Sequence, residues 1–142
     1  MAQDTQTKAD QMIRTVEDYF AAMDAFDFDG VLELMTPDCT LQILTGSEAF
    51  QGRDTGIAEF LRWRADNLSA SWHGDFRHSV NVAEGWIFSR FRARRTLNDK
   101  TVIHMDNVNF TEFRSQQICS VTIWMAQTPG LTDDSNSRKG ES

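Results

Sequence analysis

The chain contains three histidines, His73, His78 and His104, and a single tyrosine, Tyr19. Histidine suits proton transfer because its ordinary pKa of about 6.5 lies close to neutral pH. His73 and His104 have no carboxylate or third histidine at the spacing of a zinc site, and the sequence has neither a glycine-rich phosphate loop nor a Gly-x-Ser-x-Gly turn. We therefore expect no metal and no cofactor, and acid–base chemistry is the reaction type that these residues can support.

Further polar side chains lie on two segments that the residue pattern predicts to be neighbouring strands. If residues 98–99 form a two-residue turn, strict antiparallel pairing sets Arg90 opposite Asn107. One face of this hairpin then mixes aromatic rings, arginines and asparagines. We expect that face to line a pocket through Trp86, Phe88, Arg90, Asn107 and Asn109.

The opposite face of the hairpin is mainly apolar, with Phe91, Val108 and Phe110 as its largest side chains. An apolar outer face on a small domain must be covered by the protein's own helices or by a second copy. We expect a homodimer through this outer sheet face. Two alternatives stay open: the arginines form a solvated face, or a one-residue slip in a longer turn exchanges the two faces.

Helices are predicted ahead of these strands. Apolar residues recur at helical spacing over 9–23, which indicates a first helix. Asp27 can cap a short second helix that ends at Pro37, because proline cannot continue the helical ladder. A third helix follows Asp54, and its stripe consists of Ile57, Phe60, Leu61, Arg64 and Leu68.

The strands come mostly at the end of the chain. A short hairpin of 40–44 and 49–51 precedes the third helix. Beyond residue 74 the apolar period changes from about 3.6 to about 2, and turn signals at 84–85, 98–99 and 115–116 divide the remainder into four strands. Helices followed by strands indicate an α+β fold in which three helices pack over one face of a curved antiparallel sheet.

Length and charge set further limits. The 142 residues are 40% apolar and 25% charged, which suits one hydrophobic core. We expect a single domain over 9–127, a flexible segment over 1–8 and a disordered tail over 128–142, because the tail has almost nothing apolar to bury. The net charge of -7 disfavours binding to nucleic acid.

Targeting and redox signals are also weak. No apolar run reaches the roughly 20 residues of a membrane span, and the amino terminus has no signal-peptide core. The two cysteines, Cys39 and Cys119, form no disulfide or metal pattern. The sequence therefore predicts a cytoplasmic protein that does not bind membranes.

The order of these elements resembles the SnoaL-like, or nuclear-transport-factor-2-like, superfamily, which includes ketosteroid isomerase, scytalone dehydratase, bile acid dehydratase, limonene epoxide hydrolase and polyketide cyclases. The resemblance covers residues 9–127 and rests on segments 19–24, 27–29, 46–48, 76–78 and 104–110. It implies a cone-shaped sheet with helices closed over one pocket, and pairing of sheets back to back. It implies no single reaction, because members differ in their chemistry and some have none.

Carried over position by position, the resemblance implies a catalytic set. Tyr19 matches the tyrosine with which ketosteroid isomerase donates a hydrogen bond to a developing oxyanion. Asp24 and His78 match the acidic residue and the catalytic histidine of the two dehydratases. Asn107 or Asn109 matches a pocket asparagine of scytalone dehydratase. We expect His78 to transfer protons while Asp24 holds one of its ring nitrogens.

The chain also departs from these relatives. Ile43 stands where ketosteroid isomerase has its proton-shuttling aspartate and where scytalone dehydratase has a tyrosine, so we expect Ile43 to be part of the pocket wall. Arg90 resembles the pocket arginine of limonene epoxide hydrolase, but Arg92 and Ile123 replace its two aspartates. The reactions of ketosteroid isomerase and of limonene epoxide hydrolase in their known form are therefore not expected.

The leading hypothesis is a cofactor-independent lyase or isomerase with dehydratase-like acid–base chemistry. Its substrate would be a small, largely apolar carbonyl or hydroxyl compound in an enclosed pocket. The alternative is a non-catalytic small-molecule-binding or dimerisation module of the same fold. Taken singly, Tyr19, Asp24 and His78 fit ordinary structural roles equally well. Together, three matching positions on different elements favour the enzyme.

Overall fold

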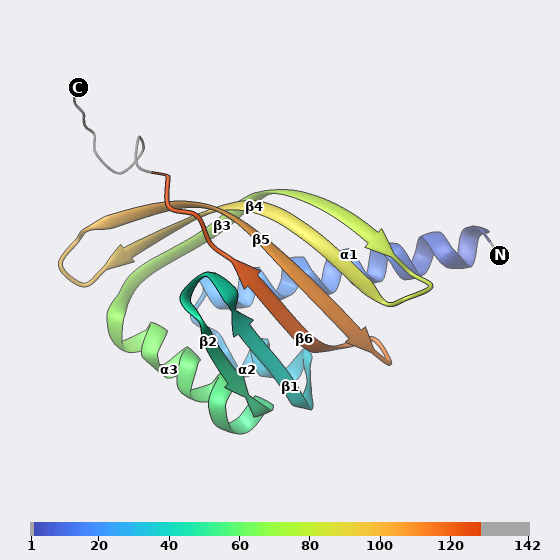
Figure 1. The fold of residues 1–142 in the computed structure, drawn as a ribbon, viewed down its shortest axis with the longest axis horizontal. Helices are drawn as coiled ribbons and strands as arrows, with labels where there is room; N and C mark the ends of the chain where they lie inside the picture. Colours follow the sequence, from blue (N-terminus) through green and yellow to red (C-terminus); the bar gives the residue numbers. More distant parts are fainter. Residues whose placement is uncertain (1, 129–142) are drawn as a thin grey trace.

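The structure, a computed structural model, describes residues 2–128 (Figure 1). The predicted tail therefore lies outside the described residues, except for Thr128. The elements, in chain order, are α1 (Ala2–Asp24), α2 (Phe28–Glu33), β1 (Met35–Ile43), η1 (Leu44–Gly46), β2 (Glu48–Gln51), η2 (Gly52–Ile57), α3 (Ala58–Asn67), β3 (Leu68–Asn81), β4 (Trp86–Leu97), β5 (Val102–Arg114) and β6 (Gln117–Trp124).

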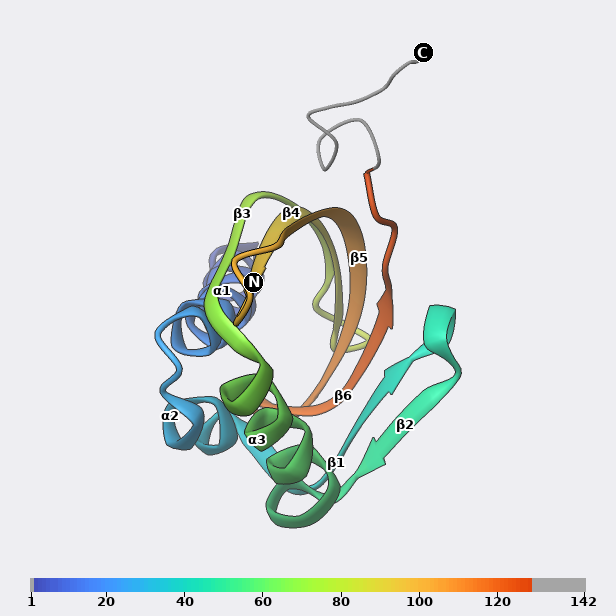
Figure 2. The ribbon, with the colours of Figure 1, turned by 90° about the vertical axis from the view of Figure 1, so that its left-hand side faces the viewer.

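The strands form one curved sheet in the order β2-β1-β6-β5-β4-β3. The three helices lie along its concave side, between the β3 edge and the β1–β2 hairpin (Figure 2). This arrangement confirms the predicted α+β cone. The sheet is mixed rather than wholly antiparallel, because β6 returns from the meander to pair with β1 in parallel. No helix within residues 2–128 combines the length and the apolar character needed to cross a membrane.

Helix α1 begins at Ala2, ahead of the predicted start at Ala9, so residues 2–8 are helical. No proline or glycine interrupts this polar first part. An ion pair between Lys8 and Asp4, one turn apart, spans it. The second half buries the stripe Val16, Tyr19, Phe20 and Met23 against the sheet.

Helix α2 begins as predicted at the cap residue Asp27, whose carboxylate accepts a hydrogen bond from the Gly30 amide at 3.1 Å. It ends at Glu33, and Met35 already starts β1. Pro37 therefore lies within the strand rather than directly after the helix. The pairing of β1 with β6 is irregular between Met35 and Thr40, where the missing amide of Pro37 is tolerated.

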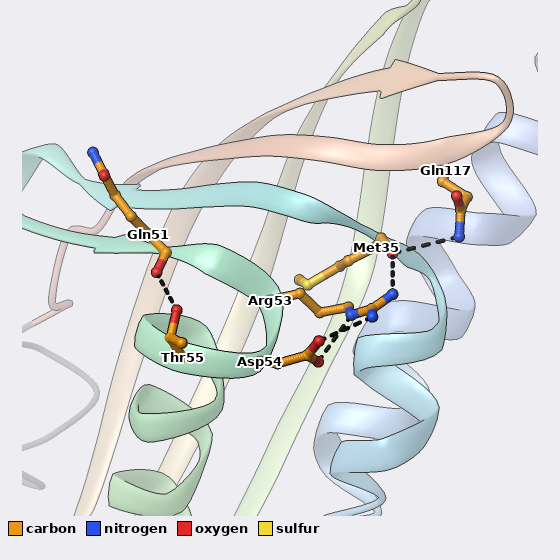
Figure 3. A network of polar contacts seen from close by, with 6 residues as sticks. All are labelled: Met35, Gln51, Arg53, Asp54, Thr55 and Gln117. Carbon is orange, nitrogen blue, oxygen red and sulfur yellow. Dashed lines mark hydrogen bonds and ion pairs between the residues drawn. The ribbon is translucent and has the colours of Figure 1, made fainter.

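A polar network joins the start of β1 to η2 and β6 (Figure 3). Arg53 and Gln117 both donate to the carbonyl oxygen of Met35, each at 3.4 Å. The Arg53 guanidinium also donates two hydrogen bonds to Asp54, at 2.9 and 3.0 Å. These contacts fix the end of the cone from which α3 begins.

The segment η2 is a π-helical turn that leads from β2 into α3. The Thr55 hydroxyl donates to the carbonyl oxygen of Gln51 at 2.9 Å (Figure 3). Gly56 packs directly on the β2 backbone, because a Cβ at this position would lie 2.6 Å from the Gln51 nitrogen. This close approach sets the position at which α3 crosses the open side of the sheet.

The register of the β4–β5 hairpin differs from the predicted one by one residue. The loop contains three residues, 98–100, and the Leu97 amide donates a hydrogen bond to the carbonyl oxygen of Thr101 at 2.8 Å. Lys100 adopts a φ of 77°, as the last residue of such a loop requires. Arg90 therefore pairs with Val108 and not with Asn107. The slip exchanges the predicted faces of β4, and it was one of the alternatives that the sequence left open.

The exchange corrects three predicted pocket residues. Trp86, Phe88 and Arg90 lie on the outer face of the sheet, where Arg90 forms a double hydrogen bond with Asp106 at 3.0 and 2.8 Å. Phe91, predicted for the outer face, is instead 2% exposed and belongs to the core. Asn107 and Asn109 face inward as predicted, opposite Phe91 and Ser89.

Candidate functional site

A small cavity lies inside the cone, between the helices and the sheet. Its volume is about 30 Å³. Its walls come from α1, α3 and five strands, and its lining residues are Tyr19, Phe20, Met23, Ile43, Phe60, Arg64, His73, Phe91, Arg95, Asn107, Asn109, Ile123 and Met125. Most of its surface is apolar, and its polar groups are concentrated in two arginines, two asparagines, one histidine and one tyrosine.

A larger pocket of about 270 Å³ adjoins this cavity. The two share four lining residues, Ile43, Phe60, Arg95 and Met125. The larger pocket is further lined by Glu48, Phe50, Glu59 and Trp63. We call the smaller space the inner chamber and the larger one the vestibule. The histidine, the tyrosine and the two asparagines lie at the inner end, whereas the vestibule walls combine three aromatic rings with two glutamates and Arg95.

His73 on β3, which lines the inner chamber, forms a carboxylate–imidazole pair with Asp24, the last residue of α1. The His73 Nδ1 and the Asp24 Oδ1 are 2.6 Å apart. The other oxygen of Asp24 accepts the backbone amide of His73 at 2.8 Å, and Oδ1 also accepts the Ser71 hydroxyl at 2.8 Å. Asp24 thus fixes both the position and the tautomer of His73. The His73 Nε2 makes no hydrogen bond to any residue in the described part of the chain.

The protonation states of this pair suit a general base. Burial disfavours ionisation of Asp24, but the hydrogen bonds from His73 and Ser71 outweigh it and lower its pKa. Burial also lowers the pKa of His73, and the neighbouring Asp24 only partly offsets this. At neutral pH the pair is therefore an ionised carboxylate beside a neutral imidazole with an available Nε2.

His78, the predicted partner of Asp24, lies elsewhere along the same strand. Its Nε2 is 2.8 Å from Glu17 of α1, and its Nδ1 is 2.8 Å from the hydroxyl of Ser89. Glu17 precedes Asp24 by about two helical turns, roughly 10 Å along the axis. The predicted Asp24–His78 pair is therefore not formed, and His78 does not line the inner chamber.

Both histidines face inward because β3 contains a bulge. Strict alternation would place residues 73 and 78 on opposite faces of the sheet. The pairing with β4 shifts by one residue between Gly74 and Arg77, and Asp75 adopts a φ of 57° within this shift. The extra residue returns His78 to the inner face.

Arg64 of α3 extends the polar network of the chamber. Its side chain is 3% exposed, although it occupies a position in the apolar stripe of the helix. It donates to the Ser71 hydroxyl at 2.7 Å, and Ser71 in turn donates to Asp24. The Arg64 Nε is buried and has no partner among the described residues. Burial lowers the pKa of Arg64 to about 10, so it stays charged at neutral pH.

The remaining predicted residues differ in their surroundings. Tyr19 is 3% exposed, and burial raises its pKa, so its hydroxyl remains a hydrogen-bond donor. The Asn107 side-chain oxygen accepts the backbone amide of Ala126 at 3.2 Å and holds the end of the sheet. The Asn109 side-chain oxygen is buried without a partner among the described residues. Ile43 forms part of the wall of both spaces.

Sequence reasoning missed three residues of the chamber. Arg64 had a signal, since an arginine inside an apolar helical stripe must be satisfied by something polar in the core. His73 had none, because the bulge that decides its neighbours depends on strand pairing. Arg95 belongs to the run of arginines over residues 90–95, and nothing in the sequence singles it out from the others. Within residues 2–128, no three His, Cys, Asp or Glu side chains are grouped to hold a metal ion.

This geometry allows proton transfer at a bound molecule. His73 can take a proton through Nε2, and Asp24 stabilises the imidazolium that forms. Tyr19 can donate a hydrogen bond to an oxygen that gains negative charge. Both side chains line the inner chamber, and its largely apolar walls strengthen such interactions.

Comparison with known proteins agrees with this fold. A candidate polyketide cyclase from Xanthomonas campestris pv. campestris is 17% identical, with a TM-score of 0.74 over 82% of this chain and 91% of that one. A candidate isomerase from Bacillus subtilis is 12% identical, with a TM-score of 0.75 over 84% and 88%. An LEH-like epoxide hydrolase from M. tuberculosis is 16% identical, with a TM-score of 0.70 over 82% and 83%. At such low identities the likeness shows the fold alone.

Sequence comparison identifies the family. No curated protein matches the chain significantly. The profile of the SnoaL-like domain matches residues 16–121, from the middle of α1 to β6, and so covers most of the chain. The chain therefore belongs to the SnoaL-like domain family, within the nuclear-transport-factor-2-like superfamily.

Proposed function

We propose that this protein is a cofactor-independent lyase or isomerase that acts on a small, largely apolar carbonyl or hydroxyl compound. The observation that carries the proposal is the Asp24–His73 pair, with its 2.6 Å contact, whose imidazole lines the inner chamber. The lowered pKa of His73, caused by burial, keeps the imidazole neutral and able to accept a proton, and the lowered pKa of Asp24 keeps the carboxylate ionised beside it. His73 thus takes the role that the sequence suggested for His78.

The proposed reaction begins with removal of a proton from the carbon next to a carbonyl group. His73 Nε2 accepts this proton, and the C–H electron pair moves into an enolate whose oxygen accepts a hydrogen bond from Tyr19. In a dehydration, the imidazolium then returns the proton to a β-hydroxyl group, which leaves as water. In an isomerisation, it returns the proton to a different carbon. Either way, His73 ends as it began.

The relatives support an enzyme without indicating the reaction. Solved structures with this fold are described as a polyketide cyclase, an isomerase and an epoxide hydrolase, and the identities do not exceed 17% among these three. Catalysis on small organic molecules is common to these descriptions. The choice of proton transfer at carbon rests on the Asp24–His73 pair of this chain.

The test measures hydrogen–deuterium exchange at the α-carbon of small cyclic ketones in D2O, followed by NMR. The parent protein should accelerate exchange. His73→Gln should lose about a hundred- to ten-thousandfold in rate, because glutamine keeps the hydrogen bond but cannot transfer a proton at neutral pH. Asp24→Asn should lose less, because the imidazole remains. His78→Gln is the matched control, and it should keep the parent rate.

The result separates the proposal from the alternative. Equal exchange by the parent and His73→Gln would refute the role of the pair. Binding of ketones without any exchange by the folded parent protein would favour a non-catalytic binding module of the same fold.

A further inference from the structure

We infer that the ligand of this site carries a carboxylate group, which binds between Arg64 and Arg95 at the inner end of the site, while an apolar or aromatic body occupies the vestibule. The inference rests on the proposed function in taking the inner chamber as the substrate site. It does not depend on which reaction follows. It adds a substrate class, small organic acids, to the proposed carbonyl or hydroxyl chemistry.

The first observation is an unsatisfied donor. Arg64 is 3% exposed, and its Nε is buried without a hydrogen-bond partner in the described part of the chain. Its side chain donates one hydrogen bond within that part of the chain, to the Ser71 hydroxyl at 2.7 Å. A buried guanidinium N–H without a partner is costly, and such groups in native proteins are normally satisfied by protein, water or ligand. Because Arg64 lines the inner chamber, a ligand there can satisfy it.

The second observation is a second cation at the same chamber. Arg95 of β4 lines both spaces, and the one hydrogen bond of its side chain within residues 2–128 goes to the sulfur of Met125 at 3.4 Å, a weak acceptor. Burial lowers the pKa of Arg64 and of Arg95, and the charge of Arg95 lowers that of Arg64 further. Two guanidinium groups that repel each other are stabilised by an anion placed between them.

The carboxylates already present do not supply that anion. Asp24 is engaged by Ser71 and by the amide and ring of His73. Glu48 and Glu59 line the vestibule, and Glu48 acts on Arg95 at longer range. Within residues 2–128, the ion pairs shorter than 4.0 Å include neither Arg64 nor Arg95.

Size and shape favour a carboxylate as the anion. The inner chamber has a volume of only about 30 Å³, so only a small end group of a ligand can lie there while the rest of the ligand extends into the vestibule. A planar carboxylate matches the fork of an arginine side chain. The vestibule of about 270 Å³, with Phe50, Phe60 and Trp63 in its walls, suits the remainder of a small aromatic or aliphatic acid.

The test compares phenylacetate with phenylacetamide, its neutral analogue of nearly equal size. Isothermal titration calorimetry at neutral pH measures both affinities for the full-length protein. Phenylacetate should bind at least about tenfold more tightly, as charge-assisted hydrogen bonds imply. Arg95→Gln should remove this preference. Arg92→Gln, on the same strand but on the exposed outer face, should keep it.

Several outcomes would overturn the inference. They are equal affinity for the two compounds, an undiminished preference in Arg95→Gln, and no binding of phenylacetate up to about 10 mM, where even millimolar dissociation constants register. His73→Gln should still bind phenylacetate, so failure of the exchange experiment leaves this inference standing, and failure here leaves the proposed proton transfer standing. Arg64→Lys, which retains the charge, should weaken phenylacetate binding and keep the fold.

Discussion

At the scale of single residues, the proposed proton transfer depends on the hydrogen bonds that the Asp24 carboxylate accepts. Asp24 accepts three hydrogen bonds, from the Ser71 hydroxyl, the His73 amide and the His73 ring. Arg64 contributes through Ser71 without touching Asp24 directly. This arrangement keeps the carboxylate ionised and holds the imidazole by one nitrogen, which leaves the other for a substrate.

The pH dependence of exchange follows from this pair. The proposed base is neutral His73, and burial lowers its pKa below the ordinary value of about 6.5. The rate at subsaturating substrate should therefore be constant through neutral pH and fall in acid, with a midpoint below about 6.5. A rate profile from acid to neutral pH tests this.

The free energy of unfolding should change with pH in the same direction as the exchange rate. Between the lowered pKa of folded His73 and about 6.5, the unfolded chain binds more protons, so the free energy of unfolding should decrease as the pH falls through this range. His73→Gln should remove that part of the decrease in a thermal melt series, whereas His104→Gln should not.

For the rate profile, a midpoint above 6.5 in the parent protein would contradict the assignment of His73 as the base.

At the scale of elements, two local irregularities determine what the cone contains. The bulge in β3 turns both His73 and His78 inward, and each then meets a carboxylate of α1. The three-residue loop between β4 and β5 turns Phe91 inward and Arg90 outward. In each case one residue of register decides which side chains can reach the chamber.

The turn before α3 is a third such element, and it can be tested through Gly56. A Cβ at Gly56 would lie 2.6 Å from the Gln51 nitrogen and 2.7 Å from its carbonyl oxygen, so the backbone must move. Gly56→Ala should lower the free energy of unfolding by about 1–3 kcal/mol, as overpacking usually does. Chemical denaturation measures the change.

The control for this prediction is Gly46→Ala. A Cβ there meets the Glu48 side chain at 3.4 Å, and Gly46 has no positive φ, so stability should change by less than about 0.5 kcal/mol. If Gly56→Ala is equally harmless, the packing of η2 against β2 does not position α3.

At the scale of the whole molecule, the outer face of the sheet carries a patch of aromatic side chains. The rings of Trp86, Phe88 and Phe110 lie 4.8 to 5.7 Å from one another, and Trp124 stacks near Phe88 at 6.5 Å. Phe88 is 39% exposed and Trp124 is 37% exposed. We call this set the outer aromatic patch, and it replaces Phe91 as the centre of the predicted dimer surface.

The prediction of a homodimer stays, with this patch as its centre. Such an interface should bury well over about 1,000 Å² in total. Phe88→Glu should convert the dimer into a monomer, because it places a charge in the apolar centre. Light scattering at micromolar concentration measures the mass. Leu44→Glu, at an exposed apolar residue outside the patch, should leave the dimer intact. A monomeric parent protein would contradict the prediction.

The sequence by itself determined the class and order of the elements. Apolar spacing at 3.6 and 2 residues depends only on which side chains must avoid water, so the helices and the meander could be predicted from it. The SnoaL-like fold, which is confirmed, followed from the resemblance. The inward positions of Tyr19, Ile43, Asn107 and Asn109 also follow from these periods combined with the resemblance.

Which side chains contact one another inside the cone was decided only by the tertiary structure. Whether Asp24 meets His73 or His78 depends on a bulge, and whether Arg90 or Phe91 faces the core depends on one loop residue. Neither the bulge nor the extra loop residue changes the spacing of apolar residues enough to be predicted from the sequence, because register is a property of two paired strands. The shared chamber of Arg64 and Arg95 likewise exists only because α3 crosses the curved sheet opposite β4.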